Sequence, residues 1–84
     1  MAIVNTRGLH ARPCHSIVRI ALEFPGEVEV ACDGRTANGK SILELMTLSA
    51  GLGAVLEFRA RGAGAEAVLR SFVGLVGSGF QETD

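Results

Sequence analysis

The sequence predicts a single α+β domain over residues 1–84. In this fold a four-stranded antiparallel sheet carries three helices on one face, in the order β-α-β-β-α-β-α. Segments in which apolar and charged residues alternate indicate strands with one buried face. Segments with apolar residues three or four apart indicate the helices that cover that face. Glycine is abundant, with 11 residues, as is typical of short elements joined by tight turns.

The first two predicted elements are a short strand and a long helix. The pattern over Ala2–Asn5 favours a strand only weakly, whereas residues 11–24 have clear helical spacing. Pro13 is tolerated in the first helical turn, and Pro25-Gly26 ends the helix. The apolar stripe of this helix comprises Cys14, Ile17, Val18, Ala21 and Phe24.

A β-hairpin follows. Glu27–Cys32 alternates between valine or cysteine on one face and glutamate on the other, and Arg35–Ala37 is the returning strand. The connecting Asp33-Gly34 is a dipeptide that two-residue hairpin turns favour strongly.

The last three elements are a short helix, a strand and a helix. Ser41–Leu48 begins with a capping-box sequence, which makes Ser41 the expected N-cap. Ala54–Arg61 alternates as a strand with Leu56 and Phe58 on one side. Ala65–Val76 repeats the helical pattern, with apolar positions at Val68, Leu69, Phe72, Val73 and Val76, and Gly77 after the last.

Composition argues against several classes of protein. The net charge is -1, the eight basic residues are spread along the chain, and Trp and Tyr are absent, so no nucleic-acid partner is expected. No apolar run approaches the roughly 18 residues that span a bilayer, and no signal-peptide pattern opens the chain. We therefore expect a cytoplasmic monomer that does not insert into membranes. We expect Cys14 and Cys32 to be reduced and at least partly buried.

His10 is the candidate functional residue. It lies where the first strand gives way to the helix, so the free N–H groups of the first helical turn and the helix dipole would favour an anion beside its ring. Arg12 could add a charge-assisted hydrogen bond. Imidazole is nucleophilic at neutral pH and can hold a phosphoryl group. The alternative interpretation is a solvated histidine at a helix start.

Two motifs resemble one known family. The string Gly8-Leu9-His10-Ala11-Arg12-Pro13 is similar to the active-site motif of the histidine-containing phosphocarriers, which comprise HPr and its nitrogen-branch relative NPr. The run from Gly39 to Leu48 resembles the second signature of that family at the expected distance. The resemblance covers nearly the whole chain and implies the HPr-like open-faced β-sandwich.

The resemblance also implies a role for each site residue. His10 would accept a phosphoryl group on Nδ1 from enzyme I, which phosphoenolpyruvate charges, and would pass it to an enzyme IIA domain. Arg12 matches the arginine that steadies the phosphate. The protein would then be a carrier that forms a transient phosphohistidine, without catalysing a reaction of its own and without a cofactor.

Ser41 has a structural and a regulatory interpretation. As an N-cap it would contribute about 1 kcal/mol to stability. It also matches the serine that HPr kinase/phosphorylase modifies in some family members. The phosphoserine form would then bind a transcription regulator.

Helical geometry separates the apolar residues of the short helix into two stripes. Leu45 and Leu48 lie on one, which we expect to be buried, and the other is Ile42, Leu43 and Met46. We expect the second stripe to be an exposed docking patch beside His10, at positions where the family binds enzyme I and IIA domains. The alternative is one broad buried arc.

Cys14 and His15 depart from the small apolar residues that are commoner in the family. A structural zinc site needs four well-placed ligands, and Cys14 is expected to face the core, so no metal site is predicted. Cys14 could still be a mildly activated thiol near a helix N-terminus.

Two other functional interpretations stay open. One is a nitrogen-branch phosphocarrier, favoured by the acidic tail from Ser78 to Asp84. The other is a regulatory module that acts through phosphoserine, which the intact His10 disfavours as the sole role. The Lys40-Ser41-Ile42 string favours the sugar-uptake type.

Overall fold

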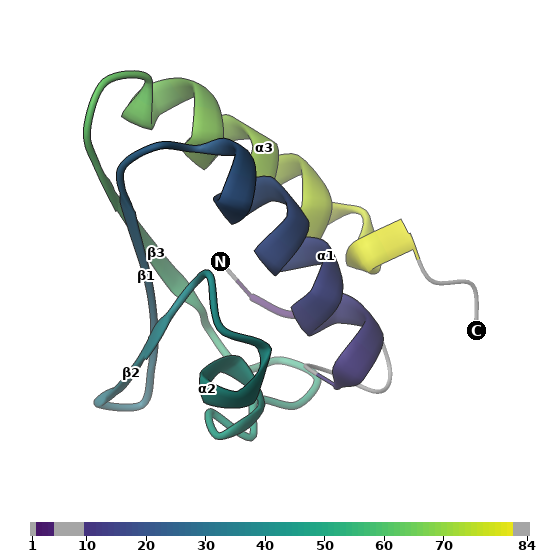
Figure 1. Cartoon of the computed structure of the whole chain (residues 1–84). Coiled ribbons are helices and arrows are strands. Elements are labelled where there is room, and N and C mark those ends of the chain that lie inside the picture. Colours follow the sequence, from purple (N-terminus) through teal and green to yellow (C-terminus); the bar gives the residue numbers. More distant parts are fainter. Residues whose placement is uncertain (1, 5–9, 82–84) are drawn as a thin grey trace.

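The computed structural model describes residues 2–4 and 10–81. It contains α1 (Ala11–Glu23), β1 (Glu27–Cys32), β2 (Arg35–Asn38), α2 (Ile42–Met46), β3 (Glu57–Arg61), α3 (Ala65–Gly77) and the short 3-10 helix η1 (Gly79–Gln81). Figure 1 shows α1 and α3 packed side by side against one face of the sheet, with α2 below them near the β2 end. This is the predicted α+β layer arrangement. Within the described residues, none of the helices has the length and apolar character needed to cross a membrane.

The sheet is antiparallel and has the order β2-β1-β3. The predicted bounds of β1 are confirmed, and the Asp33-Gly34 turn joins Cys32 directly to Arg35. Asp33 and Gly34 have φ values of 51° and 77°, as a two-residue type I′ turn requires.

The expected fourth strand is not seen. Within the described residues, the sheet has three strands, and the segment predicted as Ala2–Asn5 makes one isolated bridge, Ala2 to Val55. Asn5 lies outside the described residues. Ile3 exchanges main-chain hydrogen bonds with Ala54 and Gly53, each 2.8 Å long. Gly53 has φ 86° and lies in a turn, so the chain opposite Ile3 and Val4 leaves the extended conformation there.

The core lies between the sheet and the helices. It contains the inward residues of β1, the buried stripe of α1 and the inner face of α3. Phe58 of β3 and Phe72 of α3 stack with ring centroids 4.6 Å apart, which joins the two layers. The apolar stripe predicted for the last helix is confirmed in α3 except at Val73, which is 53% exposed.

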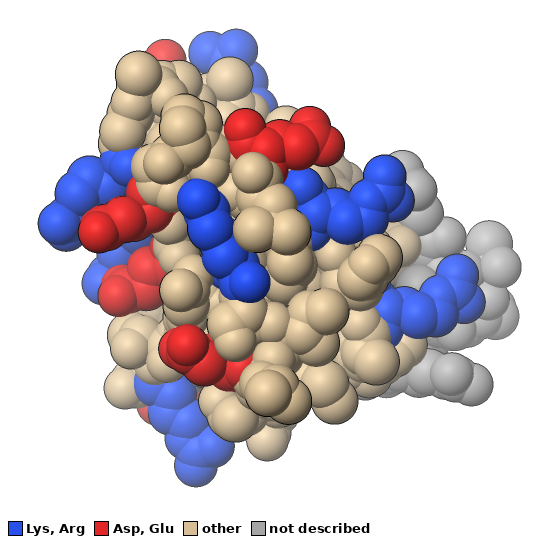
Figure 2. All heavy atoms as spheres, viewed as in Figure 1, with Lys and Arg blue, Asp and Glu red and all other residues tan. Residues whose placement is uncertain are grey.

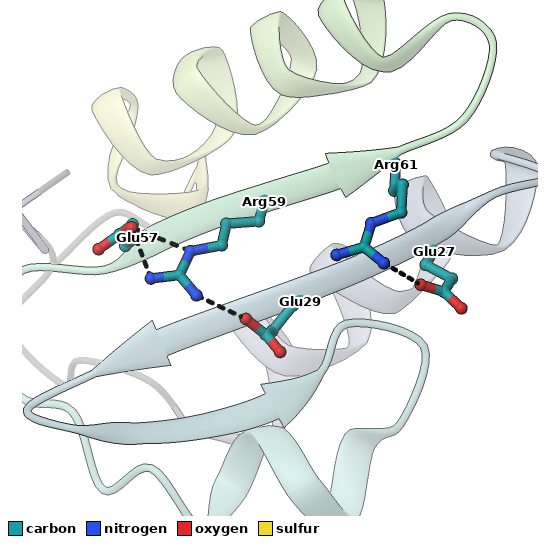
Figure 3. Close-up of polar contacts among 5 residues, drawn as sticks. All are labelled: Glu27, Glu29, Glu57, Arg59 and Arg61. Atoms are coloured by element: carbon teal, nitrogen blue, oxygen red, sulfur yellow. Dashed lines mark hydrogen bonds and ion pairs between the residues drawn. The ribbon is translucent and has the colours of Figure 1, made fainter.

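The outer face of the sheet is charged, as the alternating pattern predicts. Arg59 donates to Glu57 at 2.8 and 3.0 Å and to Glu29 at 3.0 Å, and Arg61 lies 3.8 Å from Glu27 (Figure 3). These pairs lie on the side of the sheet opposite the buried apolar residues. The sheet is therefore covered on one face only.

Candidate functional site

His10 is the N-cap residue of α1. Its backbone is extended (φ -116°, ψ -168°), and its carbonyl oxygen accepts the first helical hydrogen bond from the Cys14 N–H at 3.0 Å. The side chain makes no capping hydrogen bond to the helix and is half-buried. The imidazole thus stands at the positive end of α1 without serving as its cap.

Two main-chain donors lie beside it. The N–H groups of Ala11 and Arg12 precede the first intrahelical bond and have no acceptor within the helix, whereas Pro13 has no N–H group. The first turn of α1 also contains no acidic residue. A negatively charged group at this end would meet the helix dipole and these two amides.

Arg12 differs from Arg59 and Arg61 of β3 and from Arg70 of α3. Arg59, Arg61 and Arg70 each form an ion pair with a glutamate. Arg12 is exposed and makes no ion pair with any residue that the structure describes. Its guanidinium is therefore available to an anion at His10, two residues away.

Cys14 is fully buried on the inner face of α1, as predicted. Burial raises the pKa of its thiol to about 11. The expectation of a mildly activated thiol is therefore wrong, because desolvation outweighs the helix N-terminus at this position. His15, the next residue of the helix, is exposed. Among the described residues, no three His, Cys, Asp or Glu side chains are grouped so that they could hold a metal ion.

Ser41 is the N-cap of α2, as predicted. Its Oγ accepts a hydrogen bond from the Glu44 N–H at 3.2 Å. The reciprocal half of the capping box is redirected, because the Glu44 carboxylate accepts from the Asn38 N–H at 3.1 Å. The Ser41 N–H donates instead to the Asn38 carbonyl oxygen at 3.0 Å.

Lys40 makes a tertiary contact that the sequence pattern does not predict. Its Nζ donates to the carbonyl oxygen of Phe24, the C-cap of α1, at 2.8 Å. This bond ties the loop before Ser41 to the C-terminal end of α1. It joins segments 16 residues apart, so only the fold reveals it.

The two predicted stripes of α2 are largely confirmed. Leu45 and Leu48 are buried, whereas Leu43 and Met46 are 80% and 44% exposed. Ile42 is only half-buried and packs against the core, so its predicted exposure is only partly correct.

Leu52, in the loop after α2, is 60% exposed and was not predicted as part of the patch. In Figure 2 the surface over α2, at the lower centre, is mainly uncharged. α2 packs against α1, and Figure 1 shows α2 and the start of α1 both in the lower part of the molecule.

Comparisons with known proteins agree with this geometry. Residues 1–78 match the family model PTS-HPr, described as the PTS HPr component phosphorylation site. The phosphocarrier protein HPr of Neisseria meningitidis is 38% identical over 80 residues, which is 95% of this chain and 90% of that protein. The phosphocarrier protein NPr of Shewanella violacea is 32% identical over 82 residues, covering 98% of this chain and 90% of that protein.

A solved structure has the same fold. The crystal structure of HPr-C-His from Thermoanaerobacter tengcongensis superposes with a TM-score of 0.93 at 34% identity, over 100% of this chain and 94% of that chain. The sequence relatives, the match in fold and the histidine at the start of α1 lead to one conclusion. The chain belongs to the HPr family, the HPr and NPr phosphocarriers of the phosphotransferase system.

Proposed function

We propose that His10 is the phosphoryl acceptor of this carrier, that it receives the group from enzyme I, and that it passes it to an enzyme IIA domain. The observation that carries the proposal is the position of His10 at the N-cap of α1, with a side chain that does not cap the helix. At this position the ring lies beside the N–H groups of the first turn of α1, which favour an anion.

The transfer follows from the groups around the ring. The lone pair of neutral Nδ1 attacks phosphorus as the bond to the donor breaks, and the reverse process delivers the same group to the acceptor. The amides of Ala11 and Arg12 and the Arg12 guanidinium stabilise the oxygens of the phosphoryl group. The protein contributes a nucleophile and an electrostatic environment, and the donor and acceptor proteins contribute the remaining catalytic groups.

The docking surface for both partners is proposed to be the patch on α2. Leu43 and Met46 form its exposed part, and Ile42 forms its half-buried edge. Apolar groups surrounded by polar surface are typical of protein interfaces. Enzyme I and the IIA domain would use the patch in turn, because each must bring its own site to His10.

Regulation at Ser41 is a second proposal that concerns the same surface. Ser41 is partly exposed and directly precedes Ile42. A phosphate there would add negative charge at the edge of the docking patch, on the oxygen that accepts from the Glu44 N–H. Phosphorylation by an HPr kinase/phosphorylase would then weaken docking to enzyme I and create a surface that a transcription regulator could recognise.

For the physiological branch we propose sugar uptake, on the strength of the Lys40-Ser41-Ile42 string. Relatives of both the HPr and the NPr type match over most of the chain, so the nitrogen branch is the alternative. Measuring which type of IIA domain removes phosphate faster from the phosphorylated protein would separate the two.

The test of the acceptor uses both histidines of the chain. The protein is incubated with enzyme I and phosphoenolpyruvate labelled in its phosphoryl group. His15→Ala is the matched control, since His15 is exposed on the same helix. We expect an acid-labile, base-stable phosphoprotein that forms with His15→Ala and does not form with His10→Ala. Label retained by His10→Ala would contradict the proposal.

A further inference from the structure

α2 carries the proposed docking patch but is too short to hold its own position. It comprises Ile42–Met46, five residues, whereas isolated helices shorter than roughly 12–15 residues are unstable in water. Leu45 is the one residue of this helix that is buried in the core. The orientation of α2 must therefore be set largely by contacts that lie outside the helix itself.

The loop before α2 is bonded to the sheet and to α1. The Gly39 N–H donates to the Val28 carbonyl oxygen of β1 at 2.8 Å, and a Cβ atom added at Gly39 would overlap the Val28 side chain. Lys40 then makes two bonds: its N–H donates to Asn38 Oδ1 at 2.9 Å, and its Nζ donates to the Phe24 carbonyl oxygen at 2.8 Å. Figure 1 shows this loop rising from α2 toward the upper end of α1.

The bond from Lys40 to Phe24 is the direct polar link between the two helices of the proposed site. In the part of the chain that the structure describes, no other hydrogen bond or ion pair joins residues 11–24 to residues 39–48. Arg35 donates to the carbonyl oxygen of Thr47 at 3.3 Å, but that bond ties the end of α2 to β2. Lys40 therefore connects the helix of the docking patch to the helix that begins at His10.

The acceptor end of this bond is suited to a cation. Phe24 is the C-cap of α1, and the last turn of α1 contains no basic residue, so the negative end of its dipole lacks a cation from the helix itself. Lys40 supplies that cation through a charge-assisted hydrogen bond. The anchor is also rigid, because the Phe24 ring is buried and a Cβ atom added at Gly26 would lie 2.7 Å from its Cε2.

Lys40 makes this bond although carboxylates share its surroundings. Glu27, Glu29 and Glu44 line the same cavity as Lys40, which has a volume of about 420 Å³. None of the ion pairs between described residues involves Lys40. The ammonium group thus joins two main-chain segments instead of balancing a neighbouring charge, which indicates a role in positioning.

We propose that Lys40 is a positioning residue of the docking surface. It holds the start of α2 against the end of α1 and so sets where Leu43 and Met46 lie relative to His10. The inference rests on the proposed function, because the patch concerned is the one that enzyme I would use. A partner must contact the patch and His10 in one complex, so a shift of α2 makes fewer complexes productive. The chemistry at His10 is unaffected, since the bond lies at the other end of α1.

The test compares two variants of Lys40. Lys40→Met keeps an unbranched side chain that cannot donate, whereas Lys40→Arg can still donate. The rate of phosphoryl transfer from phosphorylated enzyme I is measured against the concentration of this protein. We expect KM to rise about threefold to tenfold in Lys40→Met with kcat unchanged, and to stay within about twofold in Lys40→Arg. A KM for Lys40→Met equal to that of the original chain would overturn the proposal.

Arg70→Met is the matched control, because it removes the same charge from the exposed surface of α3. It should behave like the original chain. An equal rise of KM in Arg70→Met would show that net charge, and not the bond to Phe24, controls docking, which would also overturn the proposal.

Phosphoramidate, a small phosphoryl donor, separates docking from the chemistry at His10. It needs no docking surface, so it should phosphorylate the original chain and Lys40→Met at the same rate. A slower reaction of Lys40→Met with phosphoramidate would assign Lys40 to the chemistry at His10 and contradict a positioning role. Failure of enzyme I to phosphorylate the original chain at His10 would refute the proposed function instead.

Salt distinguishes positioning from a direct contact between Lys40 and the partner. The difference in KM between Lys40→Met and Lys40→Arg should persist at about 0.5 M salt, which screens exposed charges. A difference that disappears at this salt concentration would assign Lys40 to a contact with an acidic partner and would overturn the proposal.

The geometry itself can be measured in the free protein, whether or not enzyme I is its partner. Residual dipolar couplings of the backbone amides should show α2 reoriented relative to α1 in Lys40→Met and unchanged in Lys40→Arg. The couplings of α3 and the sheet show that each variant is folded. In the original chain, the hydrogens on Nζ of Lys40 should exchange slowly with water. An unchanged orientation of α2 in Lys40→Met, or fast exchange at Nζ, would contradict the proposal.

Discussion

At the scale of single residues, Arg12 occupies a position that helix electrostatics disfavour. A cation in the first turn of a helix opposes the positive end of the dipole, at a cost of about 0.3–1 kcal/mol. No carboxylate among the described residues compensates for the charge of Arg12. Departures from local rules of this kind are common at functional sites, where stability is reduced in favour of ligand binding.

Replacement of Arg12 by alanine should therefore separate activity from stability. We expect the rate of phosphoryl transfer from enzyme I to fall about tenfold to a hundredfold, the amount that a lost charge-assisted hydrogen bond explains. The thermal midpoint should stay the same or rise slightly, because the unfavourable charge is removed. An unchanged transfer rate, measured with the labelled phosphoryl group, would exclude Arg12 from the mechanism.

Cys14, unlike Arg12, is a residue whose chemical form fits its surroundings. Its burial raises the pKa of the thiol to about 11, so the folded protein favours the neutral form. The stability that this raised pKa gives the folded state is complete below the ordinary thiol pKa and is lost as the pH rises toward 11.

The native protein should accordingly react with iodoacetamide at neutral pH about a hundredfold more slowly than an ordinary thiol does, because less thiolate is present. Cys32 is also buried and should be slow as well. The same protein unfolded in denaturant provides the control, and both cysteines should then react fully. Rapid labelling of Cys14 in the folded state would argue for an accessible thiolate.

At the scale of elements, the local chemistry of the sequence predicts where most elements begin. The N-cap serine of α2, the Asp33-Gly34 turn and the proline in the first turn of α1 each act within a few residues, and the structure contains all three features. The last turn of the predicted Ser41–Leu48 helix does not form as α-helix, and α2 ends at Met46. Periodicity alone cannot detect such an end, because Leu48 is buried by the fold even outside the helix.

The exposed stripe of α2 leads to a prediction about docking. Because Leu43 is 80% exposed, Leu43→Glu should change the free energy of unfolding by less than about 0.5 kcal/mol. The same change should weaken binding to enzyme I by about tenfold or more, since it places a charge inside the proposed interface. Met46→Glu should act in the same direction. Isothermal titration with unphosphorylated enzyme I measures the affinity.

Val73→Glu is the matched control, because Val73 is also an exposed apolar residue but lies on α3. It should leave the affinity for enzyme I unchanged. Equal weakening by both variants would place the docking surface elsewhere.

At the scale of the whole molecule, the sequence predicts the layers of the fold better than the number of strands at the edge of the sheet. Alternation and helical spacing are enough to place charged residues outside and the core residues inside. The number of strands depends on what lies opposite the N-terminal segment, and among the described residues that contact is one bridge, next to the turn at Gly53. Likewise, the Lys40 to Phe24 bond depends on tertiary structure, so no local pattern could have predicted it.

Close packing between the ends of β1 and β3 provides a further test. A Cβ atom added at Gly26 would overlap the main-chain carbonyl oxygen of Arg61, which the β1–β3 ladder holds in place. Gly26→Ala should therefore lower the free energy of unfolding by about 1–3 kcal/mol. Gly74 lies in α3 with open space around it, so Gly74→Ala should raise the free energy of unfolding by about 0.5–1 kcal/mol. Denaturant unfolding measures both, and a Gly26→Ala variant of full stability would contradict the packing described.

The central claim is that the imidazole at the start of α1 carries the phosphoryl group. The most direct measurement is NMR of the ring nitrogens of His10 and His15 in the ¹⁵N-labelled protein, before and after phosphorylation by enzyme I and phosphoenolpyruvate. We predict a new phosphorus coupling at Nδ1 of His10 and unchanged nitrogen signals for His15. Phosphorus on His15, or a phosphorylated protein in which neither ring is modified, would contradict the account.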